Sequence, residues 1–165
     1  MAILINYLTK YITLPPILHS QAVKYTSSAV IEDGGALWVL GGGHKDHHVQ
    51  SSTQIVRPGR PTAWGPNMTE ASFSHCSSTL EDYTVMVTGG RRMSDHTGGA
   101  RTEVYSFTTQ QWSRREDMNH RRMYHSCTTV WLKSSSHPKN GIIGRDAVNS
   151  SGSVLSLVVA GGEPL

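Results

Sequence analysis

The chain has 165 residues, of which 37% are hydrophobic and 16% are charged, and its formal net charge is +3. This length suits one ordinary domain, and the apolar content is too high for general disorder. The small net charge does not by itself indicate nucleic-acid binding. No run of roughly 18 apolar residues indicates a transmembrane helix.

The chain begins with an apolar stretch, residues 1–8, which has no basic residue before the apolar run and is interrupted by Asn6. It is a poor signal peptide, and we expect the protein to be cytoplasmic. The two cysteines are Cys76 and Cys127. Two thiols in a chain of this length do not make a disulfide framework, so we expect both to be buried and reduced.

Three apolar runs along the chain each end in paired glycines. Each run predicts a short buried strand that stops at residues able to adopt positive φ. The pairs are Gly41 and Gly42, Gly89 and Gly90, and Gly161 and Gly162. Three such endings indicate a repeat, and a repeat determines the fold.

Other residue types recur with the same period. The methionines and histidines of the repeat are 50 residues apart and the tryptophans 48, namely Met68 and Met118, His75 and His125, and Trp64 and Trp112. Tyr25 stands 50 residues before His75 and is interpreted as the residue that replaces the histidine. The shared spacing predicts structural units of ~50 residues.

The second unit contains four strand-like segments separated by turn residues, at 74–80, 83–89, 101–107 and 110–114. Short strands joined in order predict an antiparallel four-stranded meander, and the fold class is therefore all-β. A four-stranded meander of ~50 residues is typical of a β-propeller blade.

These residues resemble the kelch repeat. Residues 72–118 match its pattern well, with Ser72 where the family usually has Arg, and the matching residues are His75, Tyr83, Gly89, Gly90, Tyr105 and Trp112. The resemblance implies a kelch-type propeller fragment with two full blades and a half blade at each end. A complete ring needs about four to eight blades, so we interpret the chain as a fragment, a partial gene model or one part of a split ring.

The resemblance divides the chain into four parts. Residues 1–20 would be the last strands of a preceding blade, residues 21–71 and 72–121 full blades, and residues 122–165 a truncated blade. The last part contains a Ser- and Gly-rich insertion, residues 133–153, which is expected to be flexible.

The recurring side chains are expected to be structural. Trp64 and Trp112 would fill the wide outer gap between blades, and His75 and His125 would form hydrogen bonds to the blade turn. The cluster from His44 to His48 contains good metal ligands, but a solvated loop is the favoured interpretation, and we expect no metal or other cofactor. Asn67 and Asn149 begin glycosylation sequons, which matter only in a secreted protein.

Three basic pairs, at 91–92, 114–115 and 121–122, would lie on loops at the blade rims. Solvated charge is the favoured interpretation of these pairs, and a rim that binds an acidic peptide is the functional one, because arginine pairs suit carboxylates. The expected partner-binding residues are Arg91, Arg92, Arg121, Arg122, Tyr124, His44 and His48.

The kelch resemblance implies a non-enzymatic protein-interaction module, either the substrate-recognition part of a ubiquitin-ligase adaptor or a scaffold. Its partner would be a protein, such as an acidic peptide segment, and neither nucleic acid nor a membrane. The alternative is a fragment of a galactose-oxidase-like copper enzyme, which needs Tyr and His ligands and a Cys–Tyr cross-link. Fold alone does not choose between these functions.

Overall fold

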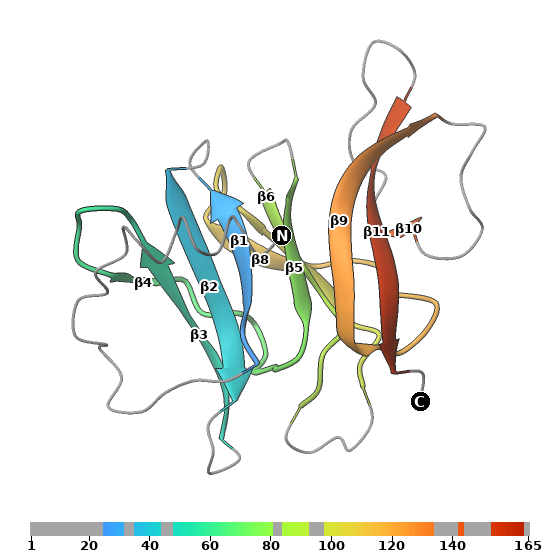
Figure 1. Cartoon of the computed structure of the whole chain (residues 1–165), viewed down its shortest axis with the longest axis horizontal. Helices are drawn as coiled ribbons and strands as arrows, with labels where there is room; N and C mark the ends of the chain where they lie inside the picture. The colour runs from blue at the N-terminus through green and yellow to red at the C-terminus, as the bar shows by residue number, and fades with distance from the viewer. Residues whose placement is uncertain are drawn as a thin grey trace.

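The computed structural model describes residues 25–31, 35–43, 48–80, 84–92, 98–133, 142–143 and 153–163. The expected preceding-blade strands in 1–20, the candidate His44 and most of the 133–153 insertion lie outside these residues. Figure 1 shows three sheets that stand side by side along the chain.

The described residues form eleven strands and no helix, in agreement with the predicted all-β class. The first sheet has the order β1-β2-β3-β4 and the second the order β5-β6-β7-β8, and all neighbouring pairs are antiparallel. Their bounds are β1 Ser27–Ile31, β2 Ala36–Gly43, β3 Val49–Val56, β4 Ala63–Gly65, β5 Cys76–Leu80, β6 Thr84–Thr88, β7 Thr102–Ser106 and β8 Gln111–Arg114. The four strands expected in the second unit are all present, each slightly shorter than expected.

The third sheet has the order β10-β11-β9, with β9 at Met123–Lys133, β10 at Ile142–Ile143 and β11 at Ser153–Glu163. β9 and β11 form a long antiparallel pair. The short strand β10 lies within the segment that the sequence assigns to a flexible insertion, and it pairs with β11. The insertion therefore contributes a strand to the sheet.

The first strands of the three sheets lie next to one another: β1 contacts β5, and β5 contacts β9 (Figure 1). Two hydrophobic cores result, and β6 shows how they are separated. Val85 and Val87 belong to the core with the first sheet, whereas Met86 belongs to the core with Leu157 of the third sheet. Alternate side chains of a strand point to opposite faces, so the apolar run of β6 is buried on both sides.

An aromatic cluster fills the core between the first and second sheets. The Trp38 ring is fully buried, and its centroid lies 5.0 Å from that of Tyr105 and 5.6 Å from that of Trp112. Trp112 thus packs between sheets as expected. Trp64 does not, because it remains 46% exposed on the three-residue strand β4.

The paired glycines are the points at which consecutive sheets come into close contact. All six adopt positive φ, as predicted, and Gly41 produces a register shift in the pairing of β2 with β3. A Cβ built on Gly89 would lie 2.6 Å from Cε1 of His125 and 2.7 Å from the carbonyl oxygen of Arg122. Only a residue without a side chain fits so close to the neighbouring chain.

His75 and His125 are both buried and occupy equivalent positions. Each ring lies beside the first glycine of the preceding sheet: His75 beside Gly41, and His125 beside Gly89. His125 shares a 3.1 Å hydrogen bond with the Thr88 hydroxyl of the second sheet, not with its own turn as expected. The repeated histidine therefore fixes one sheet against the next.

The strand register corrects the assignment of Tyr25. Because Ser27 pairs with Leu40 and Cys76 pairs with Thr88, the residue equivalent to His75 in the first sheet is Thr26. Tyr25 instead matches Ser74 and Tyr124, and all three have φ between 55° and 58°. An apparent period of 50 between Tyr25 and His75 was one residue too long.

The prediction of reduced cysteines is wrong: Cys76 of β5 and Cys127 of β9 form a disulfide, with Cα atoms 5.9 Å apart. The repeat explains why they meet. Cys76 corresponds to Ser126, so Cys127 is one residue further along its strand and points to the opposite face. Cys76 faces the third sheet and Cys127 faces the second, across the contact between β5 and β9.

Candidate functional site

A pocket of about 270 Å³ opens beside the end of β6. Four arginines line it, Arg92, Arg101, Arg114 and Arg121, together with the acidic residues Glu103 and Asp117. The backbone of Gly89, Gly90, Gly98 and Gly99 forms another part of its wall. Guanidinium groups outnumber carboxylates in the lining, so the pocket suits an anionic group better than a cationic one.

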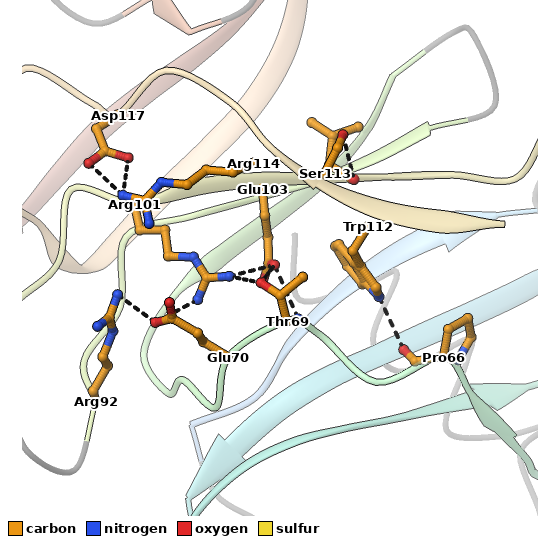
Figure 2. Close-up of polar contacts among 11 residues, drawn as sticks. Pro66, Thr69, Glu70, Arg92, Arg101, Glu103, Trp112, Ser113, Arg114 and Asp117 are labelled. Carbon is orange, nitrogen blue, oxygen red and sulfur yellow. Dashed lines mark hydrogen bonds and ion pairs between the residues drawn. The ribbon is translucent and has the colours of Figure 1, made fainter. Parts of the chain in front are cut away.

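An ion-pair network forms one side of this pocket (Figure 2). The Glu70 carboxylate lies 2.5 Å from Arg92 and 2.9 Å from Arg101, so two guanidinium groups share it. Arg101 also pairs with Glu103 at 2.7 Å. Thr69 donates to the same Glu103 oxygen through its hydroxyl, at 2.5 Å, and through its backbone N–H, at 3.2 Å.

Burial divides the network into a fixed part and an accessible part. The Arg101 and Glu103 side chains are 11% and 4% exposed, whereas those of Arg92 and Glu70 are 45% and 37% exposed. A buried ion pair that accepts further hydrogen bonds is held in one geometry. Arg101 and Glu103 therefore position the site, and Arg92 presents a guanidinium group to solvent at its edge.

A second ion pair lies on the same pocket. Arg114 at the end of β8 donates to both carboxylate oxygens of Asp117, each at 2.8 Å (Figure 2). Both side chains are about half exposed. An exposed pair contributes little to stability, at about 0–1 kcal/mol, so this pair can rearrange when a ligand binds.

Aromatic residues gather near the first strands of the sheets and form a group that we call the aromatic patch: Tyr25, Phe73, Arg91 and Tyr124. The Tyr25 ring centroid lies 6.2 Å from that of Phe73 and 6.0 Å from that of Tyr124. The Arg91 guanidinium lies over the Phe73 ring at 5.8 Å. Tyr25 and Tyr124 are more exposed than large aromatic residues of a core.

The backbone under the aromatic patch connects the three sheets. Ser74 N–H donates to the Tyr25 carbonyl oxygen at 2.9 Å, and Tyr124 N–H donates to the Ser74 carbonyl oxygen at 3.0 Å. The residues at the same position of each repeat are thus joined in a chain of hydrogen bonds. This chain holds Tyr25 and Tyr124 close to each other at the surface.

The predicted site residues have different roles. Arg92 and Arg121 line the pocket, and Arg91 and Tyr124 belong to the aromatic patch. Arg122 donates to the Gly161 carbonyl oxygen at 2.6 Å and so connects the chain before β9 to β11. His48 is exposed beside β3, away from the residues that line the pocket, and His44 lies outside the described residues.

Sequence reasoning missed Arg101 and Glu103, the buried pair of the site. They are two residues apart at the start of β7, and such residues share one face of a strand. An arginine and a glutamate with this spacing in an otherwise apolar strand were a signal for a buried ion pair. Glu70 gave no comparable signal, because it lies in the irregular segment between β4 and β5.

Burial keeps the two repeated histidines neutral near pH 7. Burial lowers the pKa of His75 from 6.5 to about 4, and the nearby His125 lowers it further. Burial, with Arg122 next in size, lowers the pKa of His125 to about 4. The Leu40 carbonyl slightly favours the protonated form of His75, yet neither nitrogen of this ring has a partner of hydrogen-bond geometry among the described residues.

Within the described ranges, no three His, Cys, Asp or Glu side chains are grouped as metal ligands would be. Nor does any helix in this part of the chain have the length and apolar character to cross a membrane.

The chain was compared with protein-family models, and no family matched. A comparison with curated proteins likewise found no significant match.

Proposed function

We propose that the protein is a non-enzymatic binding module that recognises an acidic peptide segment of a partner protein. The observation that carries this proposal is the pocket lined by Arg92, Arg101, Arg114 and Arg121. Arginine guanidinium groups bind carboxylates in paired hydrogen bonds. Glu70, held between Arg92 and Arg101, occupies the place that a carboxylate of the partner would take.

We further propose that the three sheets are consecutive blades of a kelch-type β-propeller. Three features support this proposal: the four-stranded order of the first two sheets, the adjacent first strands β1, β5 and β9, and the repeated glycine–histidine contact. In this arrangement the residues after the second strand of each sheet, including Arg91 and Arg92, lie at the rim.

The aromatic patch is the second part of the proposed binding surface. Tyr and Arg are enriched among the residues that contribute most to protein–protein affinity. Arg91 and Arg92 are consecutive, and their side chains reach Phe73 and Glu70 respectively, so one segment serves both the patch and the pocket. A peptide with an acidic residue next to an apolar one matches this arrangement.

Of the two interaction roles implied by the kelch resemblance, the disulfide favours a binding module outside reducing compartments over a ubiquitin-ligase adaptor in the cytosol. The copper-enzyme alternative requires a Cys–Tyr cross-link. Both cysteines are joined to each other, which leaves neither available for that bond.

The test uses fluorescence anisotropy with a labelled Glu-rich peptide and, for comparison, the same peptide with Gln in place of Glu. We expect the acidic peptide to bind and the neutral one to bind at least ~10-fold more weakly, corresponding to 1.4 kcal/mol. The variants Arg92→Gln and Arg121→Gln should each weaken binding of the acidic peptide.

Arg60→Gln is the matched control, because Arg60 is an exposed arginine in the turn between β3 and β4, outside the pocket lining. It removes the same charge and should leave the affinity unchanged. Equal losses in Arg60→Gln and Arg92→Gln would show attraction to net charge alone and would reject the pocket. Unchanged melting temperatures exclude misfolding as the cause of any loss.

A further inference from the structure

We propose that Asn67 carries an N-linked glycan and that the protein folds in an oxidising secretory compartment. Asn67, Met68 and Thr69 form the acceptor pattern Asn-x-Ser/Thr. So short a pattern often arises by chance, and the proposal therefore depends on two structural observations. It is independent of the proposed binding function.

The first observation is the disulfide between Cys76 and Cys127. Disulfides form and persist in the endoplasmic reticulum and outside the cell and are rare in the cytosol, where thiols are kept reduced. When the bond forms, two thiols lose two electrons and two protons to a thiol–disulfide oxidant, which such a compartment supplies. The structure therefore contradicts the expected cytoplasmic location and indicates the compartment in which the sequon matters.

The second observation is the position of Asn67 itself. It is exposed, in the segment between β4 and β5, and the residues that follow it are fixed. Met68 is buried with its methyl group beside Gly41, and its N–H donates to the Ser51 carbonyl oxygen at 2.8 Å. A glycan is bulky and belongs on the surface, and an exposed side chain next to a fixed neighbour provides such a position.

The reaction joins the Asn67 side-chain nitrogen to the anomeric carbon of a lipid-linked oligosaccharide. The new N–C bond forms as the C–O bond to the lipid diphosphate breaks. The diphosphate leaves with the bonding electron pair, and the nitrogen loses one proton to a base. In the folded protein the Thr69 hydroxyl is bound to Glu103, so we place the transfer before this loop packs against β7.

The experiment expresses the whole chain behind a heterologous cleavable signal peptide in cultured eukaryotic cells, and the readout is taken from the lysate as well as the medium. The glycan is released by an endoglycosidase in heavy-oxygen water, which converts a glycosylated asparagine to labelled aspartate. We expect the label at Asn67. The variant Asn67→Gln should lose it, and Thr69→Ser, which keeps the sequon, should retain it.

Asn149→Gln removes the second sequon and should leave the label at Asn67 unchanged. An unlabelled Asn67 in a chain whose Cys76–Cys127 bond is intact overturns the glycosylation. A chain from the secretory pathway whose cysteines both react with an alkylating reagent overturns the compartment. The compartment is overturned as well if the chain made in the cytosol, with both thiols reduced, melts at the same temperature as the secreted chain.

Discussion

Gly89 of the second sheet lies directly against the His125 ring of the third sheet, so close that a Cβ on the glycine would be 2.6 Å from Cε1 of the ring. Gly41 and His75 repeat this contact between the first and second sheets. The contact combines a backbone that needs positive φ with a buried side chain of fixed size.

We expect Gly89→Ala to lower the free energy of unfolding more than Gly59→Ala. Both glycines have φ near +65°, but a Cβ on Gly59 would meet nothing within 4 Å. The control should lose about 1–2 kcal/mol from the left-handed backbone alone. Gly89→Ala should lose about 1–3 kcal/mol more from overpacking. Urea unfolding measures both, and equal losses would contradict the close packing between sheets.

Removal of the disulfide should destabilise the fold. The bond joins residues 51 positions apart, and a native disulfide typically contributes about 2–4 kcal/mol. We expect the double variant Cys76→Ser/Cys127→Ser to unfold at lower urea concentration than the oxidised protein. A reducing agent should lower the midpoint of the original protein and leave that of the double variant unchanged. A midpoint insensitive to the reducing agent would argue against the bond.

Acid should destabilise the protein through the two buried histidines. In the folded state the pKa of both His75 and His125 is about 4, below the ordinary value of 6.5. Between these values the unfolded chain binds more protons than the folded chain, so stability falls as the pH drops from 6.5 toward 4. Melting temperatures across this interval should decrease, and His75→Gln should flatten the decrease.

His120→Gln is the control for the pH experiment, since His120 is exposed. Its melting profile should have the same slope as that of the original protein. A profile that His75→Gln leaves just as steep would show that other groups cause the acid sensitivity.

The buried carboxylate of Glu103 should matter more than the exposed one of Asp117. Glu103→Gln removes the charge that faces Arg101 at 2.7 Å in a buried site, and a hydrogen bond to a charged group contributes about 1.5–3 kcal/mol. Asp117→Asn affects an exposed pair worth about 0–1 kcal/mol. Thermal unfolding of the two variants compares them, and a larger loss in Asp117→Asn would reverse the assignment of fixed and accessible parts.

The sequence was sufficient to predict the strands and their antiparallel order, because Gly41, Gly89 and Gly161 mark equivalent positions and each apolar run before them is long enough for one strand. It did not predict the exposure of Trp64. A tryptophan at a repeat position indicates a candidate core residue, but its burial depends on what packs over β4, which periodicity does not specify.

The candidate site was predicted in part. Arg92 and Arg121 were identified as basic pairs on loops, but their common pocket depends on how the segment before β9 folds back onto the second sheet, through bonds such as that from the Gly90 N–H to the Arg122 carbonyl oxygen. The disulfide was present in the sequence as an offset: Cys127 is one period plus one residue after Cys76. Combined with the alternation of side chains in strands, this offset was enough to place the two thiols face to face.

The hydrogen-bond chain from Tyr25 through Ser74 to Tyr124 has a consequence for cooperativity. These bonds exist only when neighbouring sheets are docked, whereas the ladder bonds of β6 exist whenever the second sheet is formed. The amide protons of Ser74 and Tyr124 therefore report the separation of sheets, and those of β6 report the melting of one sheet. Hydrogen exchange at these amides distinguishes a protein that unfolds as one unit from one that loses its sheets one after another.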